Sequence, residues 1–370
     1  MLEVEKSVTD TEVRVFCIGD PHFKVSNVRE MNEMTERVLN KIRETQPNFI
    51  VCLGDILDRH SNIHVVPLTM AMKFLKELSM IKDLYIVIGN HDRPNNSNFC
   101  TEEHPFIACK FWERTVVIDT TMMVERDDNK FIFVPYVPPG RFMEAIRLLR
   151  RNTECQDDVS DILRGVTCIF AHQEFYGAKM EEGIESSHGD HWPVSYPLCI
   201  SGHIHHYDDL QSNMIYVGTP MQHEYNDMST KTVSMFKFKQ NEFEHERFDL
   251  GLTRKYVVHL RAEEVSTYEP PKNTLVVLVI CGTQPEIDVC KKIQRIKEFQ
   301  KSGIKVKYKT QGTSDVLVNV RLTKDAKPVS YIRQVYNNII SSSEKIEENG
   351  RREKEKMVEI FRKLFGDVCD

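Results

Sequence analysis

The sequence predicts an α/β protein in which two mixed β-sheets pack together with helices outside, followed by a smaller C-terminal α/β domain and terminal helices. Apolar runs first alternate with helical patterns, which is typical of parallel β-α-β units. Strand-like runs then follow one another over shorter connections, which indicates mixed or antiparallel pairing. A second alternation of strands and helices begins after the turn-forming stretch 267–274.

The N-terminal half carries the parallel pattern. Hydrophobic periodicity predicts strands at 13–19, 48–54 and 84–89, separated by helices at 28–45 and 66–82. Later strand-like runs begin near residues 115, 130, 166, 197, 214 and 232. We expect these later runs to complete the two packed sheets.

The C-terminal part predicts a separate α/β unit. Turn residues at 248–256 mark a boundary, so we expect domains at 1–250, 251–325 and 326–370. Expected elements are a strand at 274–281, a helix at 284–302, strands at 304–309 and 314–321, and a helix from about 328. The last helix has one apolar face at helical spacing, made by Met357, Ile360, Phe361, Leu364 and Phe365.

Composition favours a globular protein that acts inside the cell, in the cytoplasm or nucleus, without a membrane partner. Of 370 residues, 41% are hydrophobic and 28% charged, and no run approaches the roughly 18 apolar residues of a membrane helix. The N-terminus lacks the pattern of a secretion signal. The ten cysteines contain no C-x-x-C pair, which favours free thiols. A net charge of −6 argues against a generally basic nucleic-acid-coating surface but leaves a local site open.

Five apolar runs end in polar side chains that can bind metals. The runs are "VFCIGDPH" (15–22), "FIVCLGD" (49–55), "LYIVIGNHDR" (84–93), "TCIFAH" (167–172) and "CISGHIHH" (199–206). A single Asp or Asn after Gly is usually a turn or a helix cap, and a single strand His is usually structural. Five agreeing strand ends favour a shared site, because the carboxyl ends of parallel strands meet at one edge of a sheet.

The donors at these ends predict a centre for two divalent ions. Two carboxylates, four imidazoles and one amide exceed the needs of one tetrahedral ion and fit two ions with a bridging carboxylate. Nitrogen and oxygen donors suit manganese, which we expect, as well as iron, zinc or magnesium. The expected ligands are Asp20, His22, Asp55, Asn90, His172, His203 and His205.

These motifs resemble, in order and spacing, those of the calcineurin-like metallophosphoesterases. "GDPH", "GDILD", "GNHD", "AH" and "GHIH" match over residues 13–220. Softer stretches resemble the SbcD-type nuclease subunits, especially the short forms of phages and large viruses: "FVPYVPP" (133–139), "HQEFYG" (172–177), "SSHGD" (186–190) and "YVGTPMQHEYND" (216–227). The resemblance implies a metallophosphoesterase fold and a metal-dependent phosphodiesterase that acts on DNA as an exonuclease or endonuclease.

The resemblance also implies roles for individual residues. One ion would be held by Asp20, His22, Asp55 and His205, and the second by Asp55, Asn90, His172 and His203. His91 would be the catalytic histidine that protonates the leaving oxygen, and Asp92 would orient its ring. Candidates for phosphate or substrate contacts are Asp58, Arg59, Arg93 and His188.

Alternatives and partners follow from the same motifs. "GDILDR" also resembles the G-D-x-V-D-R-G motif of serine/threonine phosphatases, so Arg59 leaves a phosphatase or small-molecule phosphodiesterase open. A non-catalytic scaffold is less favoured because no ligand is missing.

The SbcD resemblance implies DNA and an SMC-like ATPase of the SbcC type as partners in repair and recombination, with a homodimer as a further expectation. The apolar face of the C-terminal helix would either bind the ATPase, as the resemblance implies, or pack on the preceding domain.

Overall fold

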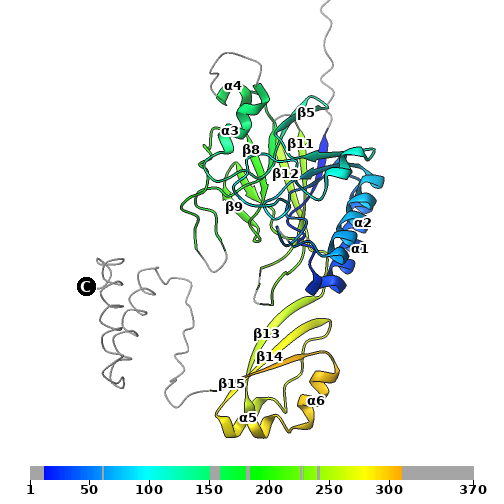
Figure 1. Ribbon diagram of the computed structural model, residues 1–370, viewed down its shortest axis with the longest axis vertical. Coiled ribbons are helices and arrows are strands. Elements are labelled where there is room, and N and C mark those ends of the chain that lie inside the picture. The colour runs from blue at the N-terminus through cyan, green and yellow to red at the C-terminus, as the bar shows by residue number, and fades with distance from the viewer. Residues whose placement is uncertain are drawn as a thin grey trace, which may run out of the picture. The chain divides into compact units, whose positions relative to one another are not determined.

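The computed structural model shown in Figure 1 describes residues 12–60, 62–150, 159–180, 184–225, 227, 229–239 and 242–310. The chain forms two compact units, Met1–Thr310 and Gln311–Asp370. All described residues belong to the first unit. The predicted strand at 314–321 and the C-terminal helix lie outside the described residues, and the boundaries near 250 and 325 stay predictions.

Two six-stranded sheets form the main body, as the sequence predicts. In the first sheet, β1 (Val13–Ile18), β2 (Phe49–Cys52), β3 (Asp83–Val87) and β4 (Thr115–Ile118) are parallel neighbours. β11 (Val233–Lys239) pairs antiparallel with β1, and β12 (Glu242–Phe248) pairs antiparallel with β11. The order is therefore β12-β11-β1-β2-β3-β4.

The second sheet has the same construction. β6 (Asn129–Val134), β7 (Cys168–His172), β8 (Leu198–Gly202) and β10 (Met214–Tyr216) are parallel neighbours. β5 (Met122–Arg126) and β9 (Asp208–Gln211) are the antiparallel edges. The run predicted near residue 115 is divided between β4 and β5, so this short stretch crosses from one sheet to the other. β9 and β12 were not predicted, because their many charged residues hide the strand pattern.

The alternation of side chains along β1 shows why the sheets stack. Val15 and Cys17 face the apolar layer between the sheets, whereas Phe16 and Ile18 face the helices outside. Figure 1 shows α1 (Val28–Thr45) and α2 (Val65–Ile81) beside the first sheet. On the second sheet, α3 (Phe142–Arg147) and α4 (Val159–Leu163) pack over a third apolar cluster. Short 3₁₀ turns occupy Val25–Asn27, Ile107–Phe111, Leu148–Arg150 and Ala262–Glu264.

A third, parallel sheet follows the main body. It consists of β13 (Arg254–Arg261), β14 (Thr274–Gly282) and β15 (Lys305–Thr310). The helix predicted at 284–302 is divided into α5 (Gln284–Cys290) and α6 (Gln294–Lys301). In a continuous helix, at about 100° per residue, the side chains of Cys290 and Ile296 would point about 120° apart around the helix axis. The break allows both side chains to pack in the same core.

Two further expectations from composition can be compared with the structure. None of the eight cysteines among the described residues forms a disulfide, in agreement with the prediction. None of the helices in the described ranges is both long and apolar enough to cross a membrane.

Candidate metal centre

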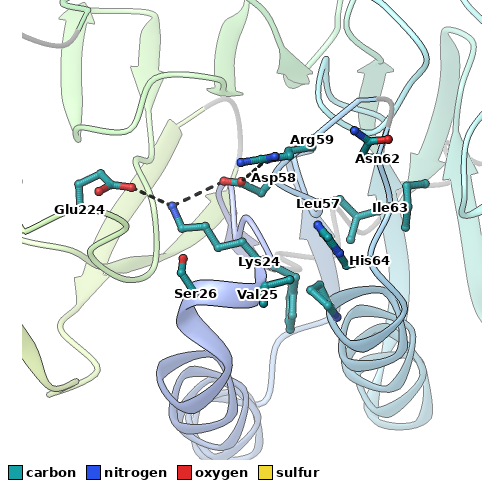
Figure 2. A pocket seen from close by; sticks show the side chains of 12 residues that line it. Lys24, Val25, Ser26, Leu57, Asp58, Arg59, Asn62, Ile63, His64 and Glu224 are labelled. Carbon is teal, nitrogen blue, oxygen red and sulfur yellow. Dashed lines mark hydrogen bonds and ion pairs between the residues drawn. The ribbon is translucent and has the colours of Figure 1, made fainter. Parts of the chain in front are cut away.

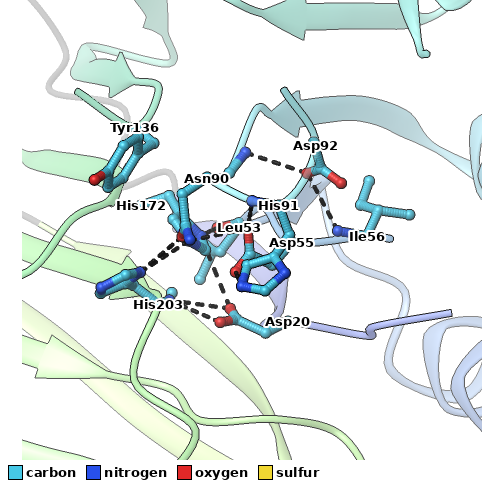
Figure 3. Close-up of polar contacts among 12 residues, drawn as sticks. Asp20, Leu53, Asp55, Ile56, Asn90, His91, Asp92, Tyr136, His172 and His203 are labelled. Carbon is cyan, nitrogen blue, oxygen red and sulfur yellow. Dashed lines mark hydrogen bonds and ion pairs between the residues drawn. The ribbon is translucent and has the colours of Figure 1, made fainter. Parts of the chain in front are cut away.

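The predicted donors converge where the parallel strands of the two sheets end. Asp20, Asp55 and Asn90 follow β1, β2 and β3, His172 ends β7, and His203 follows β8. Figure 3 shows these five side chains pointing toward one another. His22 and His205 complete the cluster, since their Nε2 atoms are 3.0 Å apart. The structure thus brings together all seven residues that the sequence singled out as ligands.

The predicted ligands form two triads. Asp20, His22 and His205 make one group, and Asp55, His172 and His203 make another; within each, the ligand atoms all lie within 4.8 Å of one another. A third group within the same limit consists of His22, Asp55 and His91, and so includes the predicted catalytic histidine. The carboxylate of Asp55 lies between the triads, with Oδ1 3.3 Å from His172 Nε2 and Oδ2 3.8 Å from His22 Nε2. This position suits a carboxylate that bridges two ions.

The spacing of the nitrogen and oxygen atoms fits shared cations. His203 Nδ1 lies 3.3 Å from His172 Nε2, and Asn90 Oδ1 lies 2.9 and 3.0 Å from these two nitrogens. Two tetrahedral ligands at about 2.0–2.1 Å from one ion are themselves about 3.3 Å apart. Nitrogen and oxygen donors at this spacing fit manganese, iron or zinc.

A hydrogen bond outside the donor set fixes which nitrogen of the His172 ring faces the centre, and a backbone N–H orients the carboxylate of Asp20. His172 Nδ1 donates to the backbone oxygen of Leu53 at 2.6 Å, so Nε2 carries the lone pair. The backbone N–H of His203 donates to both carboxylate oxygens of Asp20, at 3.1 and 2.9 Å. The ring of His172 and the carboxylate of Asp20 are therefore oriented before any ion binds.

Burial controls the charge of the centre. Burial raises the pKa of Asp20 to about 7, against the lowering effect of His172. Burial also lowers the pKa of His22 and of His203, which keeps both rings neutral and able to donate lone pairs. Burial lowers the pKa of His172 too, but the charges of Asp55 and Asp20 outweigh it and raise that pKa to about 9. The centre therefore favours positive charge beside its carboxylates, either a proton on His172 or a metal ion.

The backbone at these strand ends is strained and tightly packed. His22, Asp55 and His203 have positive φ angles of 44°, 46° and 81°, which side-chain-bearing residues rarely adopt. A Cβ atom at Gly89 would lie 2.2 Å from Asp55 Oδ1. A Cβ atom at Gly54, where φ is 100°, would lie 2.4 Å from His172 Nδ1. Glycine therefore precedes the polar donors because a side chain there would occupy their space.

The structure changes the predicted partner of His91. His91 Nδ1 donates to the backbone oxygen of Asp58 at 2.7 Å, and His91 Nε2 lies 4.0 Å from Asp55 Oδ2. The carboxylate of Asp92 instead accepts hydrogen bonds from three backbone N–H groups, those of Ile56, Leu57 and Gly89. The prediction that Asp92 orients the ring of His91 is therefore wrong, because Asp92 holds two strand-end loops together.

The four candidates for substrate contact differ in accessibility. Arg93 is buried, and its guanidinium donates to the backbone oxygens of Tyr136 and Asn98, which argues against the predicted contact with substrate. Arg59 is largely exposed, with Asp58 beside it at 3.8 Å. His188 is also exposed. For Asp58, Arg59 and His188 the role stays a prediction.

Sequence reasoning missed three residues around the donors. His223 is not among the predicted ligands, yet its ring packs against His22 with centroids 5.0 Å apart, and its Nε2 donates to the backbone oxygen of Asp20 at 3.0 Å. Glu174 approaches His203 Nε2 at 3.9 Å, and the ring of Tyr136 lies 5.9 Å from that of His203. No donor spacing marks these residues individually, but each lies in one of the SbcD-like stretches: Tyr136 in 133–139, Glu174 in 172–177 and His223 in 216–227.

The bridging position of Asp55 predicts the result of its removal. Asp55→Ala should weaken the binding of both ions, by more than about a hundredfold, since even outer-shell changes cost 10–100-fold in metal affinity. Manganese titration by calorimetry would measure this. Asp58→Asn, which changes a carboxylate of the same loop outside the donor set, should retain both ions. Unchanged binding of two ions by Asp55→Ala would contradict the bridging role.

Comparisons with known proteins agree with this geometry. The family model described as calcineurin-like phosphoesterase matches residues 13–207. Phosphoesterase 078R of Invertebrate iridescent virus 3 is 34% identical over 85% of this chain and 89% of its own. Phosphoesterase 244L of Invertebrate iridescent virus 6 is 34% identical over 79% of this chain and 98% of its own.

The similar solved structures give no evidence about function beyond the family match. GAP50, the anchor in the inner membrane complex of Plasmodium, has a TM-score of 0.36 at 11% identity, over 65% of this chain and 85% of its own. The protein TT1561 of Thermus thermophilus has a TM-score of 0.37 at 12% identity, over 64% of this chain and 99% of its own. Neither score supports an argument about function. The family match and the viral relatives show that the chain belongs to the calcineurin-like phosphoesterases.

Proposed function

We propose that this phosphoesterase is a two-metal phosphodiesterase that cleaves DNA, as the nuclease subunit of an SbcCD-like complex. The observation that carries the two-metal part is the pair of donor triads joined by Asp55. When bound, two divalent ions supply an activated water and stabilise the charge on the phosphate oxygens. Manganese is the expected activator.

The chain itself would bind and orient the substrate and supply a proton to the leaving oxygen. Hydrolysis of a phosphodiester forms a phosphorus–oxygen bond to water and breaks the bond to the leaving oxygen, which then needs a proton. His91 is a third exposed at its side chain, and its Nε2 faces Asp55 while Nδ1 is held by the backbone of Asp58. This arrangement supports His91 as the proton donor.

Removal of His91 should separate catalysis from metal binding. His91→Ala should keep both ions and lower kcat at least about a hundredfold, the usual scale for a lost general acid. Asn90→Ala is the matched contrast, because its amide oxygen lies among the donors of one triad and its loss should weaken one ion. Metal content and kcat measured on both variants would check this. Loss of metal by His91→Ala comparable to that of His203→Ala would contradict the assignment.

The proposal that the substrate is DNA rests on the SbcD-like stretches and on the additional α/β unit after residue 250. The competing candidate is a phosphatase, favoured by Arg59, whose exposed guanidinium stands beside Asp58 as in the "GDILDR" motif. A phosphatase would use a charged arginine to bind a phosphate monoester, whereas a nuclease must accept a diester within a polymer. The two candidates therefore differ in substrate class.

Substrate preference decides between them. We expect kcat/KM to be at least tenfold higher on duplex DNA with free ends than on phosphoserine peptides or small monoesters. Asp55→Ala purified in parallel should show neither activity, which controls for contaminating nucleases. Comparable or higher efficiency on phosphoprotein would favour the phosphatase instead.

The proposed complex would form, in the cytoplasm or nucleus, through the apolar face predicted at residues 357–365. That face suits a helix bound in a groove of an SMC-like ATPase. Deleting residues 344–370 should leave the nuclease activity of the isolated chain nearly unchanged and abolish co-purification with the ATPase. The double substitution Ile360→Glu with Leu364→Glu should have the same effect without shortening the chain. An intact complex with these variants would exclude this contact.

A further inference from the structure

A cavity of about 390 Å³ adjoins the candidate metal centre through two of its own loops. One wall is the segment 23–26, which follows the ligand His22, and the other is the loop after Asp55 that includes Leu57 and Asp58. Figure 2 shows the cavity between the starts of α1 and α2. Its volume lies within the range of about 300–1,000 Å³ typical of small-molecule sites.

The charges at the rim pair with one another. Lys24 Nζ lies 3.0 Å from Glu224 and 3.6 Å from Asp58, and Arg59 Nε lies 3.8 Å from Asp58. Figure 2 shows the ammonium of Lys24 between the two carboxylates. Two cations thus face two anions, so the rim offers no surplus charge to select a phosphate.

The interior combines apolar walls with neutral polar groups. Val25 and Ile63 line the cavity and are 55% and 43% exposed, so both offer apolar surface to a ligand. Ser26, Asn62 and His64 add hydrogen-bonding groups to the same walls. A purely alkyl ligand would leave these polar groups without partners, which costs free energy. A flat, uncharged ring with hydrogen-bonding edges can contact the apolar side chains with its face and the polar groups with its edge.

The cavity also has a defined place relative to the proposed reaction. Asp58 lines it, and the backbone oxygen of the same residue accepts the hydrogen bond from His91 Nδ1. The group that receives the proton from His91 is the leaving oxygen. The cavity therefore borders the loop that orients the proton donor, and Ile63 lines both this cavity and a neighbouring one that includes His91.

We propose that this cavity binds the nucleobase of the nucleotide on the leaving-group side of the scissile phosphate. The inference rests on the proposed function, because it takes the substrate to be a nucleic acid. The base would lie against Val25 and Ile63, with its edge toward Asn62 and Ser26. The cavity would then favour substrates in which this base can leave its stack.

Two oligonucleotides with a single cleavable linkage test this assignment. They differ only at the leaving-group nucleotide, which carries either a base or an abasic tetrahydrofuran residue. Because the base buries apolar surface against two aliphatic side chains, the wild type should cleave the base-bearing substrate about tenfold more efficiently. Val25→Ser and Ile63→Ser should each reduce this ratio severalfold and leave cleavage of the abasic substrate unchanged. Val25→Trp, which fills the cavity, should bring the ratio close to one.

A matched control and the opposing outcomes complete the test. Val66 is 54% exposed and belongs to α2, but it is not among the residues that line the cavity, so Val66→Ser should keep the wild-type ratio. A wild-type ratio near one, or an unchanged ratio in all three cavity variants, would overturn the nucleobase assignment alone. Cleavage of neither oligonucleotide, with persistent metal-dependent hydrolysis of bis(p-nitrophenyl) phosphate, would overturn the DNA substrate and the subsite together.

Discussion

The buried carboxylate of Asp55, between two groups of imidazoles, is the interaction on which the candidate site depends. A buried carboxylate is costly unless positive charge and hydrogen bonds compensate it. Its Oδ1 accepts a hydrogen bond from the backbone N–H of His91 at 2.8 Å and lies 3.3 Å from His172 Nε2. The same oxygen atom therefore connects the loop after β2 with the loop after β3 and with β7 of the second sheet.

The backbone around Asp55 is held against its local preference. Positive φ angles at His22, Asp55 and His203 each cost of order 1–3 kcal/mol and persist only where the surroundings fix them. Asp92 supplies part of that constraint, since its carboxylate accepts N–H groups from the loops after β2 and β3. A residue that the sequence assigns to catalysis thus serves to stabilise the shape of the site.

The link between His91 and Asp58 relates the proposed chemistry to the proposed substrate contact. His91 is oriented by a backbone oxygen, and the side chain of the same residue borders the cavity between α1 and α2. Movement of that loop would change the direction of the ring and the shape of the cavity together. Leaving-group protonation and recognition of the leaving nucleotide would then depend on one short segment.

The sequence by itself determined the two-sheet α/β fold and which polar side chains meet, because strand signals that end in a polar donor are local and parallel strands end at one edge. Charged side chains hid β9 and β12. Only the tertiary structure decided the surroundings of the donors. His223 and Glu174 reach the site although no donor spacing marks them, and Asp92 binds backbone N–H groups instead of the ring of His91. These contacts join residues far apart in the chain, and their partners are set by packing, which periodicity does not encode.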